Sequence, residues 1–499
     1  MFSQDDVAKI RQRGSDLELV YNQLERFKQG FPFTEIVAPA SVDNGIIAFS
    51  DQEKTSLANY FDQQKESFDI CRFIPASGAA TRMFKDLFTI REKLQGMSNE
   101  EQLKHIRSDA EAKMFFNSIN SFPFYADMPV KEDVSPSEIL DALLTDEGLN
   151  YGNLPKGLIK FHKYKEGNRT AFEEHLYEAA RIIGPGKKVK LHFTVSEEHL
   201  MGFQSLEKKI IPDLERKIGV DFELTYSFQK SATDTIAVDM KNNPFRDENG
   251  AIVFRPGGHG ALIENLNDLT NEIIFINNID NVSPDRNSKL RLLNKKVLGG
   301  MLLKSLDELN ELHKNIVSDD DLAIENAFSW LKNKAKVEIP EEVNTWNYES
   351  KKQWALKYLD KPLRVCGMVK NTGEPGGGPF FIRNQQGLVS LQIVEPSQID
   401  TKDQQQSTLF KQSSHFNPVD IVCCVKKRDG GTYHLSEYVD HTKGFISLKS
   451  VKGKDLKALE LPGLWNGSME GWITLFVEIP AETFTPVKTV FDLIKPEHE

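Results

Sequence analysis

The chain has 499 residues, of which 39% are hydrophobic, 27% charged and 10% aromatic. This composition is that of a globular protein and excludes a fibrous, collagen-like or fully disordered chain. Acidic residues outnumber basic residues by 73 to 62, and the net charge of −11 argues against non-specific nucleic-acid binding. We therefore expect a folded protein with no nucleic-acid partner.

The sequence shows no sign of membrane insertion or secretion. No apolar run approaches the roughly 20 residues that a helix needs to span a bilayer. The N-terminus lacks the basic start and the apolar stretch of a secretory signal, so we expect a cytoplasmic protein with no membrane partner. The cysteines are too irregularly spaced for a disulfide framework or a Cys-x-x-Cys zinc site. We expect reduced, partly buried thiols at Cys71, Cys366, Cys423 and Cys424.

The first predicted elements are helical. Apolar residues at near-helical spacing predict an amphipathic helical segment that ends at Gly30-Phe31-Pro32. A helix is expected at 52–64, followed by a strand at 69–74 that stops at a loop of small residues. Residues 84–153 are polar and carry helix N-terminal signals such as Ser135-Pro-Ser-Glu138, which predict a helical insertion.

Helices and strands alternate after this insertion. The alternation predicts βαβ units and a mainly parallel sheet. Residues 287–360 are rich in helical patterns, whereas the residues after them are richer in strand patterns. The expected helices are 171–183, 197–218 and 261–269, and the expected strands are 189–195, 222–228, 252–254, 273–276, 388–394, 420–425 and 473–479.

The first loop that could carry chemistry is Ala76-Ser-Gly-Ala-Ala-Thr-Arg-Met83, directly after a predicted strand. Small residues let the backbone approach a ligand, N–H groups near a helix start suit phosphate, and Arg82 would add charge-assisted hydrogen bonds. A tight turn between strand and helix is the commoner reason for such a loop. Lys156, in the segment Pro155-Lys-Gly157, could also reach a phosphate, although a solvated lysine is the commoner case.

Later segments carry further candidates. Arg255-Pro-Gly-Gly-His-Gly260 has almost no side chain except His259, and that much glycine is needed where another backbone or a ligand approaches closely. Phe275-Ile-Asn-Asn-Ile-Asp-Asn281 is an apolar strand with a polar end. Because ligands bind at the carboxyl ends of strands in open α/β sheets, Asp280 is placed to hold a metal ion. An Asx turn that closes the strand explains it equally well. Lys488 is a basic residue near the end of the chain, in a segment that is otherwise mostly apolar.

The order of these motifs resembles that of the UDP-sugar pyrophosphorylases, the nucleotidyltransferases that make UDP-glucose or UDP-N-acetylhexosamine. Ser77 and Ala80 stand where the family commonly has glycine, and a long insertion separates Arg82 from Lys156. The chain therefore resembles a divergent bacterial branch of that family. The matching motifs are Ala76-Ser-Gly-Ala-Ala-Thr-Arg-Met83, Pro155-Lys156, Phe228-Gln229, Pro256-Gly-Gly-His-Gly260, Asn278-Ile-Asp-Asn281 and Phe484-Thr-Pro-Val-Lys-Thr-Val-Phe-Asp-Leu493. Weaker matches are Val394-Glu395-Pro-Ser-Gln-Ile399 and Phe416-Asn417-Pro418.

The resemblance implies a fold and a reaction. The fold would be α/β, with a GT-A-like, Rossmann-like nucleotidyltransferase domain, a mixed, mainly parallel central sheet, the helical insertion and no C-terminal β-helix. The reaction would join a nucleoside triphosphate, expected to be UTP, to a sugar-1-phosphate, giving a nucleotide-sugar and pyrophosphate with Mg²⁺ as cofactor. The implied parts are an N-terminal helical segment (1–68), a nucleotide-binding core (69–83 and 154–286), the insertion (84–153), a helical connector (287–360) and a sugar-binding, β-rich part that completes the catalytic domain (361–499).

The resemblance also implies roles for single residues. Arg82 would hold the leaving β- and γ-phosphates, Lys156 the α-phosphate region and Lys488 the phosphate of the sugar. Asp280 would bind Mg²⁺. The implied nucleotide contacts are Ala76, Ser77, Gly78, Thr81, Gln229, Gly257, Gly258 and His259, and the implied sugar contacts are Asn278, Glu395 and Asn417.

Aromatic residues near the end of the chain offer another candidate. Leu464-Trp-Asn-Gly467 and Trp472 could line a sugar pocket, because aromatic rings stack on sugar faces. Core packing is the commoner role of such side chains.

Two other hypotheses stay open. A GT-A glycosyltransferase would use the same nucleotide site, but Ile279-Asp280-Asn281 is not the Asp-x-Asp metal motif usual in that class. A non-catalytic protein that binds or senses a nucleotide-sugar would suit the altered first loop and would bind without turnover. The presence of Arg82, Lys156 and Lys488 favours the pyrophosphorylase. No oligomeric state is predicted.

Overall fold

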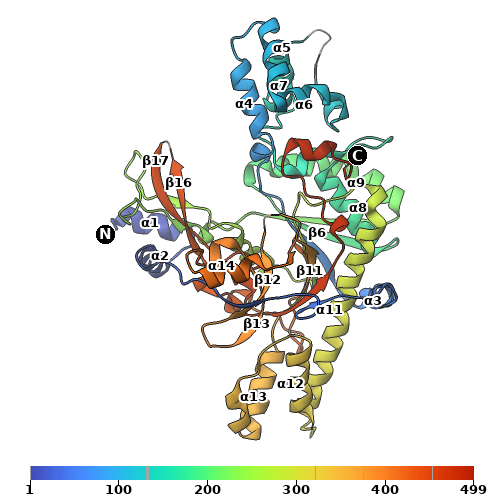
Figure 1. Ribbon diagram of the computed structural model, residues 1–499, viewed down its shortest axis with the longest axis vertical. Coiled ribbons are helices and arrows are strands. Elements are labelled where there is room, and N and C mark those ends of the chain that lie inside the picture. The colour runs from blue at the N-terminus through green and yellow to red at the C-terminus, as the bar shows by residue number, and fades with distance from the viewer. Residues whose placement is uncertain (1, 131–133, 321, 375, 452, 499) are drawn as a thin grey trace. The chain divides into compact units, whose positions relative to one another are not determined.

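The computed structural model describes residues 2–130, 134–320, 322–374, 376–451 and 453–498 (Figure 1). The chain folds into two compact units, each built from segments that are distant in the sequence. Unit 1 comprises Met1–Ile70, Gln229–Ile276 and Lys296–Pro480, and unit 2 comprises Cys71–Phe228, Asn277–Lys295 and Ala481–Glu499. This division runs across the parts that the motif resemblance implies, and their boundaries stay predictions.

Unit 1 contains a mixed sheet. Its strand order is β2 (Ile46–Ile47), β18 (Ile473–Glu478), β11 (Leu363–Lys370), β15 (Asp420–Cys424) and β10 (Ile273–Asn277). β2, β18 and β11 are parallel, whereas β15 pairs with β11 antiparallel. Every residue of β15 and β10 is buried, which is why both segments are almost wholly apolar. A second, antiparallel sheet has the order β1 (Glu35–Pro39), β12 (Gly378–Arg383) and β13 (Val389–Val394).

The N-terminal segment of unit 1 forms two helices, α1 (Gln4–Gln12) and α2 (Leu17–Gln29). A turn with Gly14 at a φ of +76° separates them. Four apolar residues of this segment are buried in one cluster with residues of β8 (Thr235–Ile236) and β17 (Lys454–Glu460). The members of this cluster from the two helices are Ile10, Val20, Leu24 and Phe27.

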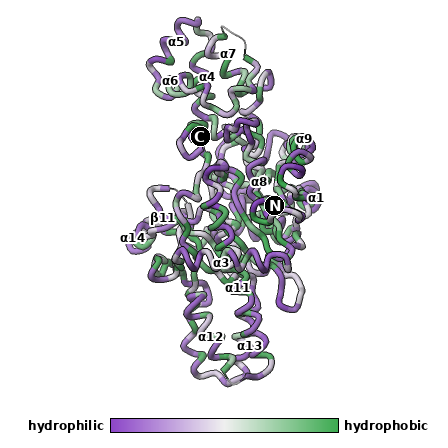
Figure 2. Tube along the Cα trace, turned by 90° about the vertical axis from the view of Figure 1, so that its right-hand side faces the viewer, coloured by the Kyte–Doolittle hydropathy of each residue, from purple (hydrophilic) through white to green (hydrophobic). Residues whose placement is uncertain are grey.

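Two glycines allow the long helix α11 (Ser288–Val317) to pack closely on α3 (Asp51–Gln64). A Cβ added to Gly300 would lie 2.1 Å from the carbonyl oxygen of Leu57, and one added to Gly299 would lie 2.5 Å from the Phe61 ring. Glycine is therefore needed here for close helix contact. The helices α12 (Ala323–Asn333) and α13 (Tyr348–Leu359) follow and lie side by side (Figure 2).

Unit 2 is built on β3 (Ile70–Pro75), β6 (Lys188–Thr194), β7 (Asp221–Ser227), α8 (Ala171–Ile183) and α9 (Leu200–Ile218). The three strands are parallel and lie in that order. α8 precedes β6 and α9 precedes β7, so helices supply the crossovers that parallel strands require. Phe172 of α8 and Phe193 of β6 join the core, with ring centroids 4.7 Å apart.

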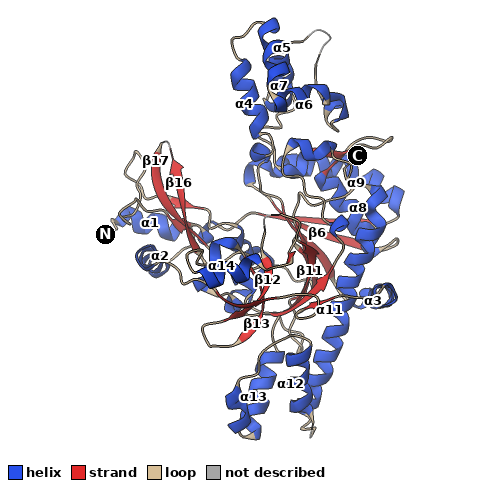
Figure 3. Ribbon diagram, in the orientation of Figure 1, coloured by secondary structure: helices blue, strands red, loops and turns tan. Residues whose placement is uncertain are grey.

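Residues 84–153 of unit 2 contain a helical group (Figure 3). Its helices are α4 (Lys85–Leu94), α5 (Asn99–Ser108), α6 (Ala110–Asn117) and α7 (Pro136–Leu144). The N-terminal signal expected at Ser135 is confirmed, because Ser135 caps α7 in a full capping box, and Ser98 caps α5 in the same way. Residues 131–133 lie outside the described residues.

The expected class of fold, mixed α/β with a mainly parallel central sheet, is confirmed. The helix predicted at 171–183 coincides with α8, and the strand predicted at 273–276 is β10. The strand predicted at 252–254 forms only as the short β9 (Phe254–Arg255). All four cysteines are free and buried. Of the helices in the described residues, none is both long and apolar enough to cross a membrane.

Replacing Gly300 by alanine is expected to destabilise the protein, because the added Cβ would meet the Leu57 carbonyl oxygen at 2.1 Å. The expected loss in the free energy of unfolding is about 2 kcal/mol, within the range for overpacked cores. Urea denaturation measures it. Lys304→Ala, at an exposed position of α11, is the control and should change stability by less than about 0.5 kcal/mol. Equal stability of the two variants would contradict the close helix contact.

Candidate active site

The first predicted loop leaves β3 beside β6 in unit 2. The Ala76 N–H donates to the Thr194 carbonyl at 2.8 Å, so Ala76 extends the pairing of β3 with β6. Ser77 and Gly78 are exposed, and a 3₁₀ turn follows at Ala80–Arg82. Thr81 and Arg82 are exposed as well. The loop therefore presents a hydroxyl, a guanidinium and glycine backbone to solvent at the end of a parallel strand.

The segment Pro155-Lys156 lies directly against this loop despite the long insertion between them. The Lys156 N–H donates to the Gly78 carbonyl at 3.2 Å, and the Ala80 N–H donates to the Leu154 carbonyl at 2.9 Å. Ala79 and Pro155 form an isolated β-bridge. The helical insertion therefore leaves and re-enters the site at neighbouring points.

Three predicted site residues, far apart in the sequence, form one cluster. The Lys156 Nζ donates to Asp280 Oδ2 at 2.8 Å, and the Lys488 Nζ donates to the same oxygen at 2.9 Å. The side chains of Lys156 and Asp280 are 13% and 10% exposed, whereas that of Lys488 is 58% exposed. Lys488 is therefore the member that solvent, or a ligand, reaches most easily.

The segment that carries Lys488 is held between the Asp280 turn and the first loop. The Val487 N–H donates to the Asp280 carbonyl at 3.0 Å, and the Val487 carbonyl accepts from Lys156 Nζ at 2.7 Å. The Val490 N–H donates to the carbonyl of Met83 at 3.0 Å. These backbone bonds fix the position of Lys488 relative to both Asp280 and the end of the loop.

Asp492, which the sequence analysis did not assign to the site, shapes the turn at Lys488. Its Oδ2 accepts from the backbone N–H groups of Lys488 at 2.8 Å and Thr489 at 2.6 Å. Its Oδ1 pairs with Lys495 at 2.7 Å. The sequence did contain a signal for this role, because Asp492 follows Lys488 by four residues and an aspartate at that spacing can reach back to cap a turn.

The charges of the cluster do not cancel. Burial raises the pKa of Asp280, but Lys488 and Lys156 outweigh this effect and hold the pKa below its ordinary value. Burial lowers the pKa of Lys156, against the attraction of Asp280. One ionised carboxylate thus faces two ammonium groups. The excess positive charge suits an anion such as a phosphate.

Asp280 fits a magnesium ion only in a limited way. Within the described part of the chain, no group of three or more His, Cys, Asp or Glu side chains is arranged to hold a metal. Mg²⁺ commonly binds one or two carboxylates and takes its other ligands from substrate phosphates and water. The ionised carboxylate of Asp280 meets that requirement if a phosphate-bearing substrate is present.

The glycine-rich loop lies in unit 1, where its glycines are explained by close backbone packing. An added Cβ would lie 2.7 Å from the Thr233 carbonyl oxygen at Gly257 and 1.9 Å from the Pro462 carbonyl oxygen at Gly260. Gly258 has a φ of +79°, and a Cβ there would lie 2.3 Å from Glu460 Oε2. The sequence allowed two reasons for so much glycine, a close backbone or a close ligand. The structure shows the close backbone.

The other predicted residues of unit 1 are engaged to different degrees. Gln229 donates to Asp234 Oδ1 at 3.3 Å. The Glu395 N–H donates to Gln398 Oε1 at 2.8 Å. Asn417 is 5% exposed, and its amide donates to the Gly367 carbonyl and accepts from the Val419 N–H. Its two amide atoms serve the fold, and its contact with a sugar stays a prediction.

Asn278, in unit 2, begins the turn that carries Asp280. Its carbonyl accepts from the Asn281 N–H at 3.2 Å, and His175 contacts the Ile279 carbonyl at 3.2 Å. A turn therefore closes the end of β10, and this turn also presents Asp280 to the lysines. Asp280 therefore lies on a backbone turn, and its binding of a metal ion stays a prediction.

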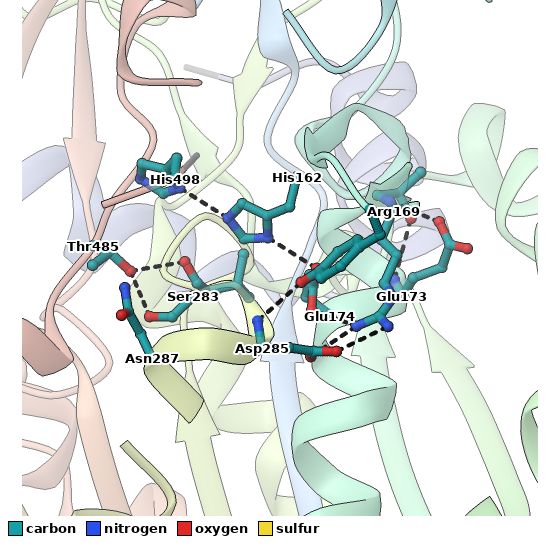
Figure 4. Close-up of polar contacts among 12 residues, drawn as sticks. His162, Arg169, Glu173, Glu174, Ser283, Asp285, Asn287, Thr485 and His498 are labelled. Carbon is teal, nitrogen blue, oxygen red and sulfur yellow. Dashed lines mark hydrogen bonds and ion pairs between the residues drawn. The ribbon is translucent and has the colours of Figure 1, made fainter. Parts of the chain in front are cut away.

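A buried polar network in unit 2 anchors the chain beyond Lys488 (Figure 4). His162 Nε2 bonds His498 Nδ1 and His162 Nδ1 bonds Glu174 Oε1, both at 2.9 Å. Thr485 and Ser283 share a hydrogen bond of 2.7 Å between their hydroxyls. No local sequence pattern connects His162 with His498, and the sequence analysis missed both.

Fold and cluster together define an α/β protein with a cationic cluster beside a small-residue loop at the end of a parallel strand. The chain belongs to the family described as "Domain of unknown function (DUF4301)", whose family model matches residues 3–499. No curated protein matches the sequence.

Solved structures similar to this chain are UDP-sugar pyrophosphorylases. The UDP-N-acetylglucosamine pyrophosphorylase of Trypanosoma brucei is 14% identical, with 96% of this chain and 74% of that chain covered and a TM-score of 0.49. The UDP-glucose pyrophosphorylase of Leishmania major is 13% identical, with 99% and 79% covered and a TM-score of 0.43. These values are too low to assign an activity to this chain.

Replacing His498 by asparagine is expected to weaken the pH dependence of stability. Burial lowers the pKa of His498 to about 3 in the folded protein, from an ordinary value of 6.5. Between these two values the unfolded chain binds a proton that the folded protein does not, so stability falls as the pH falls. Asparagine keeps an amide near the Nδ1 position but takes up no proton.

Urea denaturation at pH 7, 6 and 5 measures this effect. The wild type should lose up to about 1.4 kcal/mol more per pH unit than the His498→Asn variant. Parallel curves for the two proteins would show that His498 is protonated equally in both states, contrary to its burial against His162.

Proposed function

We propose that this chain is a sugar-1-phosphate nucleotidyltransferase, which joins a nucleoside triphosphate, in the first instance UTP, to a sugar-1-phosphate. The observation that carries the proposal is the convergence of Lys156 and Lys488 on the buried carboxylate of Asp280. The resemblance of the motifs to those of UDP-sugar pyrophosphorylases supports it. A GT-A-like nucleotidyltransferase domain without a C-terminal β-helix is part of the same proposal.

The proposed reaction is a displacement at phosphorus. A phosphate oxygen of the sugar-1-phosphate attacks the α-phosphorus of the triphosphate and forms a new P–O bond. The bond between the α-phosphorus and the oxygen bridging to the β-phosphate breaks, and its electron pair leaves with pyrophosphate. Catalysis of such a step consists mainly of positioning the two substrates and stabilising negative charge.

The cluster and the first loop offer groups suited to these tasks. Lys156 would bind the α-phosphate, Lys488 the phosphate of the sugar and Arg82 the departing β- and γ-phosphates. Phosphate oxygens would replace Asp280 Oδ2 as acceptors for one or both lysines. Because the backbone bonds of Val487 and Val490 already fix the Lys488 segment, little ordering would be needed on binding.

Asp280 would hold Mg²⁺ together with substrate phosphates. The ion would neutralise negative charge on the phosphates. Asp280 would then exchange a lysine partner for the metal. Its low pKa keeps it ionised and ready for either partner at neutral pH.

Purified protein is expected to release pyrophosphate when Mg²⁺, a nucleoside triphosphate and a sugar-1-phosphate are all present. The panel should cover the four common triphosphates and hexose-1-phosphates with and without an N-acetyl group. Release that requires both substrates would establish the transferase and identify its base and sugar. Nucleotide binding by thermal shift without release would favour a non-catalytic binding protein.

Lys488→Ala and Asp280→Asn should each lower kcat by about 100-fold or more, the usual cost of losing one group that stabilises transition-state charge. Lys188→Ala is a matched control, because the Lys188 side chain is 59% exposed and also pairs with a carboxylate, that of Glu223 at 3.1 Å. The control should keep wild-type kcat. Wild-type rates in both site variants, with folding checked by thermal melting, would refute the assigned roles.

A further inference from the structure

The ring of His259 in unit 1 is held on two sides by the segment that follows β17. His259 Nδ1 accepts from the Leu464 N–H at 3.1 Å. The ring stacks on the Trp465 indole, with centroids 4.4 Å apart and planes at 22°. A Cβ on Gly463 would lie 2.8 Å from His259 Cε1, so the segment also packs against the ring edge.

The hydrogen bond from the Leu464 N–H determines which ring nitrogen of His259 carries the proton. Because Nδ1 accepts a hydrogen bond from a backbone N–H, the proton of the neutral ring must lie on Nε2. Burial lowers the pKa of His259, against the charges of Glu395 and Glu460. At neutral pH His259 is therefore a neutral hydrogen-bond donor through Nε2.

Trp465 is itself held from the interior of unit 1. Its carbonyl accepts from Arg364 Nη1 at 2.6 Å. Arg364 is fully buried and also donates to Thr474 Oγ1 and Gln392 Oε1, each at 2.8 Å. Burying an arginine whose acceptors are neutral costs free energy. Because one of these acceptors is the Trp465 carbonyl, the buried arginine holds the Trp465 backbone in one position.

The next residue, Asn466, has a buried acceptor with no partner. Asn466 is 3% exposed, and among the described residues no group donates to its Oδ1. Its Nδ2 donates to Gln398 Oε1 at 3.4 Å, and that oxygen also accepts from the Glu395 N–H. An unpaired buried carbonyl costs about 1–3 kcal/mol. The missing donor is the kind of group that a sugar hydroxyl supplies.

We propose that Trp465 is a positioning residue of a sugar subsite: it holds His259 so that Nε2–H donates to a sugar oxygen, while Asn466 Oδ1 accepts from a hydroxyl of the same ring. This inference rests on the proposed function and names the ligand group, a hydroxyl-bearing sugar ring. Both the ribose of a nucleotide and the hexose have this chemistry.

Three variants test the role of Trp465 in turnover. Trp465→Leu should raise KM about 10-fold with kcat within about 3-fold, because the lost contact serves binding rather than the chemical step. Trp465→Phe keeps an aromatic ring and should restore KM to within about 3-fold of wild type. In Trp465→Leu the pKa of His259 should rise towards its ordinary value, because the indole no longer covers the ring, and protonation of Nδ1 would break its hydrogen bond with the Leu464 N–H. The KM ratio of Trp465→Leu to wild type should therefore rise between pH 7.5 and 5.5, and that of Trp465→Phe should stay constant.

Tryptophan emission tests binding without turnover. UDP, glucose-1-phosphate and UDP-glucose are titrated separately into wild type, Trp465→Phe and the spectral control Trp354→Phe. At least one ligand should change the emission of wild type and of the control, and the change should be lost in Trp465→Phe. A response to UDP alone assigns the subsite to ribose, and a response to glucose-1-phosphate alone assigns it to the hexose.

The outcomes separate this inference from the proposed function. Pyrophosphate release with a wild-type KM in Trp465→Leu would overturn the inference alone. A KM raised equally in both Trp465 variants, with a ratio independent of pH, would reduce Trp465 to a packing residue and also overturn it. Emission changes without any pyrophosphate release would refute the transferase and support the subsite. No emission change with any ligand overturns the subsite.

Discussion

The site of unit 2 depends on one carboxylate. Asp280 accepts hydrogen bonds from two lysines that lie 124 and 208 positions away in the sequence. A buried carboxylate is costly unless cations compensate it, and a buried lysine is costly unless an anion does. Asp280 therefore compensates the burial of Lys156, Lys156 and the more exposed Lys488 compensate the burial of Asp280, and the three segments that carry them are held to one arrangement.

The backbone around this carboxylate reinforces the arrangement. The turn at Asp280, the first loop and the Lys488 segment are joined by main-chain hydrogen bonds at Val487 and Val490. Asp492 caps the turn at Lys488, and the His162–His498 contact holds the chain beyond it. The lysines are thus placed by rigid backbone, while their excess positive charge remains for a ligand. The proposed phosphate site rests on that combination of fixed geometry and unbalanced charge.

Much of the fold could be predicted from the sequence, because its helices and strands have strong hydrophobic periodicity. The helix 171–183 and the fully buried strand at 273–276 are examples, with long apolar faces and clear ends. Lys156, Asp280 and Lys488 could be selected from motifs, but their shared hydrogen bonds could not, because partners so distant in sequence leave no local pattern. His162 and His498 were missed for the same reason. The glycines at 257–260 showed that something approaches closely, but only the fold shows that it is the chain at Glu460 and Pro462.

Within unit 2, the helical group α4–α7 departs from the first loop after Met83 and returns at Leu154, next to the point of departure. The Ala80–Leu154 and Gly78–Lys156 hydrogen bonds close this gap without any help from the helices themselves. By connectivity the group is an insertion into the core, but its buried side chains, such as Leu87 and Phe115, share one hydrophobic cluster with Ile74 of β3 and Phe193 of β6. Insertions or deletions in this group that spare those side chains in evolution would leave the spacing between the first loop and Lys156 unchanged.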